Sequence, residues 1–348
     1  LTDSDRWVEF NGIKAYKVLT AGENEQNRRQ QITLRHDFAY SNALFDSGHW
    51  QYYWQKSDVE QGYRNYRYTP AFPQMGIEES YSDFIRNSKF ESRSVGLNVE
   101  FSKLLLTDNV THDFTYGLSY RQNKVDSLEE GNAANFPSQS FPTSKVREWG
   151  IFFQDRIAFG DGKFELIPGI RYDHYELKPN GGTLYETARP DSFKPAKINK
   201  GQVSARLAFL YYLNDENIFF ANYSEGFKAP SYRSVNVGFD NSGFISQPYL
   251  YKPNPDLEPE KSRMYEIGWN YNDEKHSAAV TAYYTEYKNF IEEQSLIEMR
   301  PVDYSKAPLM IFQDINLGKS YIYGFEAKAD LEVAEVLEGR GKINLMGA

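Results

Sequence analysis

The stretch HDFTYGLSYRQ, residues 112–122, alternates between large apolar side chains and small or polar ones. Two sets result, the first Phe114, Tyr116, Leu118 and Tyr120, the second Asp113, Thr115, Gly117, Ser119 and Arg121. Successive residues of a β-strand point to opposite faces of a sheet. The pattern therefore predicts a strand with one apolar face and one wet face.

The same alternation recurs along the chain and indicates about thirteen strands. The positions between the apolar ones carry Gly, Ser, Thr, Asn, Asp and Arg, which suit a water-filled interior. Aromatic residues gather near the strand ends, where membrane-spanning barrels carry aromatic girdles. We therefore predict an all-β fold, a transmembrane antiparallel β-barrel. Pro168 lies inside one strand and predicts a local break, because proline donates no ladder hydrogen bond.

Composition narrows the classes of function. No run approaches the roughly 20 apolar residues of a spanning helix, while aromatics reach 16%, too many for a disordered chain. The net charge of −9 disfavours a nucleic-acid partner. The chain has no cysteine, which excludes thiolate chemistry and cysteine metal sites. No carboxylate pair has a catalytic setting, so we expect no enzyme, and the sequence leaves metal binding unknown.

The predicted connections alternate in length. An up-and-down membrane barrel has this alternation of short and long connections, because short periplasmic turns lie at one rim and long extracellular loops at the other. The short connections are expected at 42–48, 106–111, 160–163, 214–217 and 272–275. The long ones are expected at 59–88, 124–145, 178–200, 228–262 and 291–311.

Both ends of the chain read as abrupt. LTDSDRWVEF at the start lacks the features of a signal peptide, and KINLMGA at the end stops inside a predicted strand. Bacterial single-chain barrels normally have an even number of strands. We therefore expect residues 1–348 to be part of one barrel domain, with C-terminal strands outside this sequence.

Two short motifs carry a resemblance to a known family. GFKAP (226–230), NPDLEPEKS (254–262) and YEIG (265–268) resemble the barrel of TonB-dependent outer-membrane receptors, in particular the haem, haemoglobin and transferrin receptor branch. That branch has a Phe-Arg-Ala-Pro box and an Asn-Pro-Asn-Leu box flanking one long extracellular loop. Here the first box is Phe227, Lys228, Ala229 and Pro230, and the second box is Asn254, Pro255, Asp256 and Leu257.

The resemblance implies a receptor in the bacterial outer membrane that takes up an iron source by energy coupling. It implies a barrel of about 22 strands and an N-terminal plug domain outside this sequence. It also implies a TonB energy-coupling protein as partner through that plug, and surrounding lipid and lipopolysaccharide. The transported ligand would be haem, a ferric chelate or a host carrier protein, with no intrinsic cofactor. A ferric-siderophore receptor and a passive porin-like barrel stay open as alternatives.

Candidate site residues lie in and between the boxes. The prolines of the boxes fix the backbone and read as hinges that hold the loop. Ligand contact is expected from the aromatic and basic residues between the boxes, since Tyr and Arg are enriched at recognition sites. The candidates are Tyr232, Arg233, Phe239, Phe244, Tyr249 and Tyr251, with Tyr63, Arg64, Tyr66 and Arg67 from the predicted loop at 60–84.

Haem iron needs an axial His, Met, Cys or Tyr. Haem-specific members of the branch carry a His between the boxes, but residues 228–262 contain none. The barrel-side ligand of a bound haem is therefore expected to be Tyr249, Tyr251 or Tyr232, or else the haem arrives within a carrier protein. The chain's histidines read as interfacial side chains, four near the short-turn rim and His174 near a long loop; the four are His36, His49, His112 and His276.

Overall fold

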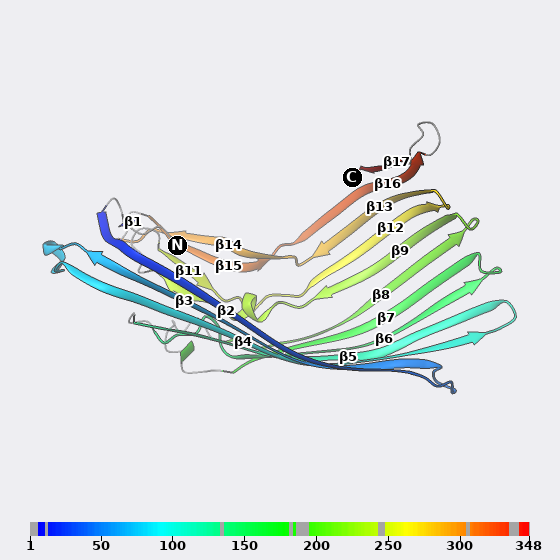
Figure 1. The fold of residues 1–348 in the computed structure, drawn as a ribbon, viewed down its shortest axis with the longest axis horizontal. Helices are drawn as coiled ribbons and strands as arrows, with labels where there is room; N and C mark the ends of the chain where they lie inside the picture. Colours follow the sequence, from blue (N-terminus) through cyan, green and yellow to red (C-terminus); the bar gives the residue numbers. More distant parts are fainter. Residues whose placement is uncertain are drawn as a thin grey trace.

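The computed structural model describes residues 6–10, 13–132, 136–180, 184–185, 195–242, 248–303, 307–333 and 341–347. Nearly all of the described chain is strand (Figure 1). The larger sheet contains β1 (Arg6–Phe10), β2 (Ile13–Ala39), β3 (Ser47–Thr69), β4 (Ser80–Leu106), β5 (Val110–Gly131), β6 (Ser144–Phe159), β7 (Phe164–Pro179), β8 (Ile198–Tyr212), β9 (Asn217–Lys228), β12 (Glu260–Asn272), β13 (His276–Lys288), β16 (Lys319–Val333) and β17 (Gly341–Gly347). No helix in these ranges is long and apolar enough to span a membrane.

The larger sheet has the up-and-down topology that the alternation predicted. Its 13 strands follow one another in chain order, β1 to β9 and then β12, β13, β16 and β17. Each ladder between neighbours is antiparallel. The sheet curves into an incomplete barrel wall (Figure 1). Pro168 breaks the pairing as expected, because the β6–β7 register passes from Gln154↔Gly169 to Ile157↔Leu166 with no pair between.

The short connections gather at one rim, at the right of Figure 1. Asp46 shows how such a turn is fixed: its carboxylate accepts hydrogen bonds from the Ser41 hydroxyl (2.5 Å), the Lys103 ammonium (2.9 Å) and the Leu104 N–H (2.8 Å). These donors lower the pKa of Asp46 to about 2. The turn is therefore held by a permanently charged side chain at neutral pH.

At the opposite rim, two of the predicted long loops are mostly strand. β3 and β4 pair as far as Thr69↔Ser80, and β5 and β6 pair from Val125↔Ser144. The expected loops at 59–88 and 124–145 are therefore wrong in extent. Both faces of a strand are wet once it leaves the membrane, so apolar alternation stops while backbone pairing continues. The 27 residues of β2 and of β4 extend about 90 Å at about 3.3 Å per residue, far beyond an apolar band about 25 Å tall.

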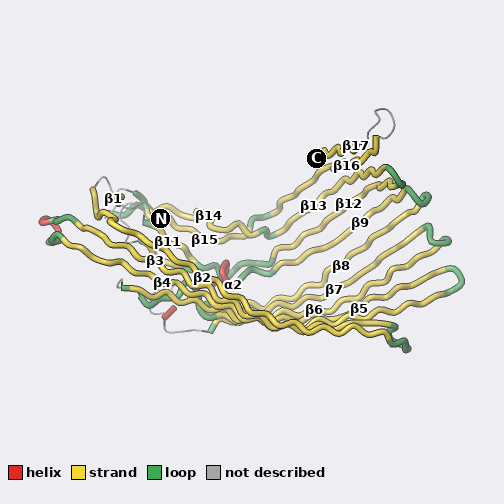
Figure 2. Tube along the Cα trace, in the orientation of Figure 1, coloured by secondary structure: helices red, strands yellow, loops and turns green. Residues whose placement is uncertain are grey.

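The other long connections are present where they were predicted. One joins β7 to β8, and a second runs from the end of β9 to the start of β12 and contains α2 (Tyr232–Asn236), β10 (Phe239–Asn241) and β11 (Tyr249–Lys252). The third folds as β14 (Ile291–Arg300) and β15 (Leu309–Asn316). These pieces form a second sheet, in the order β10-β11-β15-β14. In Figure 2, α2 lies within the curve of the larger sheet.

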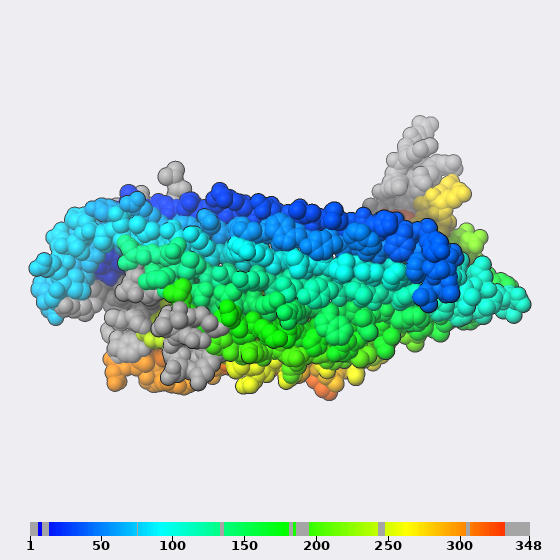
Figure 3. Space-filling model, turned by 90° about the horizontal axis from the view of Figure 1, so that it is seen from below, coloured from blue at the N-terminus to red at the C-terminus, as the bar shows by residue number. Residues whose placement is uncertain are grey.

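The two faces of the larger sheet differ in chemistry. One face, called the outer face here, carries apolar side chains open to the surroundings, among them Ile267 (63% exposed) and Phe325 (58% exposed). Figure 3 shows β2 to β9 side by side along the surface, in order of colour. The opposite, inner face carries charged residues and large aromatic side chains. Some of these rings lie over a glycine of the neighbouring strand, where a larger residue would clash with them. At Gly96 an added Cβ would lie 2.3 Å from the Tyr53 ring. Large exposed apolar rows on a single face are those of a wall that faces lipid.

We expect Ile267→Arg to destabilise the intact protein folded into lipid vesicles by about 2–4 kcal/mol, because a charge on the lipid-facing side of a strand must leave water. Its neighbour Glu266 lies on the inner face, so Glu266→Gln is the matched control and should change the free energy of unfolding by about 0.5 kcal/mol or less. Urea titration in vesicles measures both values. Equal effects would contradict the assignment of the faces.

Candidate functional site

The long excursion between the two boxes folds inward, against the inner face. β9 ends at Lys228, and the buried Pro230 turns the chain off the sheet. Ser231 then caps α2, since its hydroxyl accepts a hydrogen bond from the Ser234 N–H (3.1 Å). The first box is therefore the point at which the chain leaves the wall.

A hydrophobic cluster holds the excursion on the wall. Its members on β6, β7 and β8 are joined by side chains from α2, the second box and β14. They are Val146, Tyr175, Leu177, Ile198, Val235, Leu257 and Ile291, with Ala229 and Tyr232 packed against them. Leu177 and Val235 are fully buried. Burial of each large aliphatic side chain contributes roughly 1.5–3 kcal/mol, so the cluster fixes α2 to the inner face.

Hydrogen bonds of Asn236 stabilise the position of α2 beside this cluster. Its side chain is 0% exposed. It donates to the Ala196 carbonyl (3.0 Å) and accepts from the Ala196 N–H (2.7 Å). The Tyr185 hydroxyl donates to the Asn236 carbonyl (2.6 Å). These bonds join the end of α2 to the connection between β7 and β8.

The second box is fixed to β15. The Asn254 amide donates to the Asp314 carbonyl (2.8 Å), and its oxygen accepts from the Asp256 N–H (3.0 Å). Leu257 is 2% exposed within the hydrophobic cluster. These contacts fix the second box in place, and the hinge role expected for the boxes stays a prediction. Direct ligand contact by residues of the boxes stays untested.

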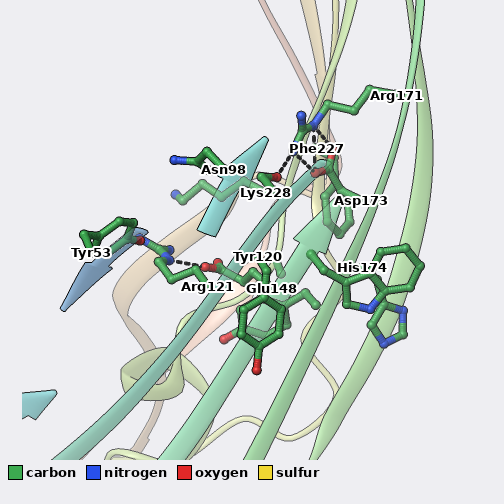
Figure 4. Close-up of a pocket in the computed structure, with 14 residues that line it drawn as sticks. Tyr53, Asn98, Tyr120, Arg121, Glu148, Arg171, Asp173, His174, Phe227 and Lys228 are labelled. Atoms are coloured by element: carbon green, nitrogen blue, oxygen red, sulfur yellow. Dashed lines mark hydrogen bonds and ion pairs between the residues drawn. The ribbon is translucent and has the colours of Figure 1, made fainter. Parts of the chain in front are cut away.

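Beside the first box, the inner face contains a cavity of about 450 Å³. Its lining comes from β3 to β7 and from the end of β9 (Figure 4). The inner-face residues that line it are Tyr53, Asn98, Ser119, Arg121, Glu148, Arg171, Asp173 and Tyr175, followed by Phe227, Lys228 and Ala229 of the first box. We call this cavity the inner pocket.

Charges in the inner pocket are arranged as ion pairs. Arg121 pairs with Glu148, and Arg171 pairs with Asp173 at 2.8 Å (Figure 4). Lys228 pairs with Glu260 at 3.1 Å but keeps a side chain that is 73% exposed. The pocket therefore offers several donors with balanced charge, which suits a ligand that carries carboxylates or other anionic groups.

No sequence motif marks the strand residues of the inner pocket. Tyr53, Asn98 and Glu148 are far apart in the chain and have no motif around them. They meet only because β3, β4, β5 and β6 pair in register. The sequence signal for the pocket was the set of charged residues at alternate strand positions, which point to the interior of the barrel.

The candidates on β3 do not gather at one site. They were expected on a loop, but they lie on a strand and alternate between its faces. Tyr63 and Arg67 share the inner face with Asn65, which donates to the Tyr63 hydroxyl (2.7 Å), and the Arg67 guanidinium lies 4.1 Å from the Phe84 ring centre. Arg64 and Tyr66 are on the other face. Arg64 binds Asp83 at 3.1 Å, and Tyr66 stacks on Tyr81 with ring centres 6.0 Å apart.

The tyrosines between the boxes have unequal access to a ligand. The Tyr251 hydroxyl donates to Asp314, and the residue is only 8% exposed. Burial and that carboxylate raise the pKa of Tyr251, and burial also raises the pKa of Tyr232. A phenolate iron ligand is disfavoured at both. Tyr249 packs edge-on against Phe239, and Arg233 is exposed; Phe244 lies outside the described residues.

Histidine and metal-binding groups do not gather within the described ranges. Four of the five histidines lie near the short-turn rim, as expected. His174 alternates with the inner-face residues Asp173 and Tyr175 and stacks on Trp149 at 5.4 Å. Nowhere in the part of the chain that the structure describes do three or more His, Asp or Glu residues approach closely enough to hold a metal ion.

Comparison with known families decides what this fold is. Residues 4–347 match the family model described as TonB dependent receptor-like, beta-barrel. The chain belongs to this family. The TonB-dependent receptor-like barrels are outer-membrane receptors and transporters rather than an enzyme family.

The proteins to which this chain is similar are named for different ligands. The chain is similar to a hemin receptor of Yersinia pestis, with 23% identity over 277 residues, 76% of this chain and 35% of that protein. It is also similar to the ferric enterobactin receptor of Pseudomonas aeruginosa, with 23% identity over 254 residues, 67% of this chain and 30% of that protein. The chain thus spans about a third of the length of these relatives.

A solved structure gives the same fold. The hemophore receptor HasR of Serratia marcescens, in complex with its hemophore HasA and heme, matches with a TM-score of 0.58 at 13% identity, over 92% of this chain and 54% of that one. At this identity the match concerns the fold of the barrel alone.

We expect Tyr251→Phe to loosen the excursion between the boxes. The change leaves the buried Asp314 carboxylate without its hydroxyl donor, which costs about 1–3 kcal/mol. Trypsin should then cut the intact receptor faster after the exposed Arg233. Tyr249→Phe is the control, because the Tyr249 hydroxyl has no hydrogen-bond partner among the described residues, and cleavage that is equally fast in both variants would contradict this role of Asp314.

Proposed function

We propose that this barrel belongs to a multi-pass receptor of the bacterial outer membrane that takes up an iron source by energy coupling. The ligand is haem or a protein that carries haem or iron. The family match over residues 4–347, together with the similarity to a hemin receptor over 76% of the chain, is the observation that carries this proposal.

The geometry of the wall supports a bulky ligand. β2 to β5 continue well past the height of a membrane, so they form a tall rim on the side of the long connections. Below that rim, the excursion between the boxes is fixed on the inner face and borders the inner pocket. A ligand captured at the rim would therefore meet the exposed Arg233 and Lys228 before it reaches the paired arginines.

The remaining parts of the receptor are also proposals. A plug domain before this segment would contact the TonB protein, and further strands would complete a barrel of about 22 strands. Lipid and lipopolysaccharide would surround the outer face. We propose neither an intrinsic cofactor nor a catalytic or nucleic-acid-binding role, in keeping with the acidic net charge of −9.

A ferric-siderophore receptor is the second candidate. The similarity to a ferric enterobactin receptor over 67% of the chain favours it, and a pocket of arginines and tyrosines also suits an anionic, aromatic chelate. A passive porin is less well supported, because the excursion between the boxes occupies the inner wall rather than leaving it open.

The two uptake hypotheses make different predictions for the intact receptor. In an iron-starved Gram-negative strain without its own haem receptors, we expect growth on haemin or haemoglobin, and no growth when TonB is absent. The purified receptor should shift the Soret absorbance of haemin. Growth and binding restricted to ferric siderophores would replace the main proposal by its alternative, and growth without TonB would exclude energy-coupled uptake.

Substitution of the tyrosines tests the iron ligand separately. If the barrel supplies an axial ligand, Tyr249→Ala should weaken haemin binding about tenfold or more, because no described hydrogen bond occupies its hydroxyl, in contrast to that of Tyr251. Tyr40→Ala at the short-turn rim, where Tyr40 is 69% exposed, is the matched control and should leave haemin binding unchanged. If Tyr249→Ala and Tyr251→Ala both left haemin binding intact, no tyrosine of this pair would be an axial ligand.

A further inference from the structure

The second sheet has one face on which aromatic rings and methionine thioethers lie together. Residues paired across neighbouring strands project to the same face of a sheet, and the registers of β10 with β11, β11 with β15 and β15 with β14 define this face. Its members are Phe239, Tyr249, Tyr251, Met310, Phe312, Leu296 and Met299. We call this set the aromatic-thioether face. Its strands lie on the side of the long connections (Figure 1).

The aromatic-thioether face is partly open, whereas the opposite face of the same sheet is covered. Leu309 and Ile311 on the opposite face are 7% and 0% exposed. On the aromatic-thioether face, Tyr251 is buried, Met310 is half-buried and Met299 is 61% exposed. The face therefore opens from β11 toward β14, where a ligand can reach it.

Met299 and Met310 form a pair of thioethers on adjacent strands. They lie directly opposite each other, which places their Cβ atoms about 4.5–5.5 Å apart. Methionine sulfur is an axial ligand of haem iron, and the unbranched side chain adapts its shape to what it contacts. On the same face the Tyr251 hydroxyl is occupied by Asp314. The thioethers are therefore better placed than that phenol to bind iron.

A cation lies beside the aromatic-thioether face. Arg233 of α2 is exposed, and it is close enough to Tyr251 for its charge to act on that residue. It forms no ion pair with any residue in the described ranges. Haem is a flat apolar ring with propionate carboxylates at one edge, and arginine binds a carboxylate through two parallel hydrogen bonds. The rings, the thioethers and the cation thus match the three chemical parts of haem.

We propose that haem binds with its ring against the aromatic-thioether face, with the Met299–Met310 pair as the source of an axial thioether ligand and Arg233 as the partner of a propionate. This site rests on the proposed function, since it takes haem as the iron source. A neutral thioether donates a lone pair to iron, so ligation releases no proton and transfers no electron. Tyr249 contributes its ring, which packs edge-on against Phe312 with centres 6.5 Å apart, rather than a phenolate.

The test measures the absorbance and the reduction potential of haem bound to the intact receptor in detergent. The parent should show the far-red charge-transfer band of thioether-ligated ferric haem. Met299→Leu combined with Met310→Leu should abolish that band, lower the reduction potential and weaken binding of ferrous haem about tenfold or more, because methionine ligation raises the potential. Leucine replaces methionine with little change of volume, so the double variant should keep the sheet folded. The two single variants show which sulfur binds the iron.

Three controls separate ligation from packing and from charge. Iron-free protoporphyrin has no metal to bind, so the double Leu variant should bind it as the parent does. Met264→Leu is the matched control, because Met264 is also half-buried but lies in the larger sheet, on β12, and it should leave the band unchanged. Arg233→Gln should weaken binding of haemin but not of haemin dimethyl ester, whose propionates carry no charge.

Three results would overturn the proposal. The first is an unchanged band and potential in the double Leu variant, and the second is an equal change in Met264→Leu. The third is loss of the bound haem's spectrum in Tyr249→Phe, which would assign the ligand to the phenol instead. A parent that binds haemin without the thioether band refutes this site alone, whereas a parent that binds no haemin refutes the proposed function together with it.

Discussion

The pairing of backbone hydrogen bonds in an environment without water is the constraint on which this structure depends. Inside hydrocarbon each N–H and C=O group must find a partner within the protein, which leaves a wall of antiparallel strands as one of few solutions. The ladders from β1 to β17 meet that need through neighbours in chain order. Once the register is set, the period of two places Ile267 toward lipid and Glu266 toward the interior.

The inner face then acts as a scaffold for the excursion between the boxes. Below the rim it exposes apolar side chains such as Val146 and Leu177, which a water-filled interior would leave uncovered. α2 and the second box cover them, with Val235 and Leu257 as the fully or nearly buried contacts. The excursion is thereby part of the wall, and its position bounds the inner pocket beside the first box.

The charges of the inner pocket are largely paired. Arginines of the inner pocket have acidic partners on the same face, so the interior presents polar groups without a strong net field.

The sequence alone determined the barrel wall, the parity of short and long connections and the interruption at Pro168. Each of these follows from local chemistry: the alternation of residues 112–122, or a proline that fixes the backbone. It did not determine how far β3 and β4 extend beyond the membrane, because strands wet on both faces lose their apolar pattern. Nor did it reveal the Tyr251–Asp314 bond or the inner pocket. These depend on the register between strands distant in the chain, and only the tertiary structure fixes that register.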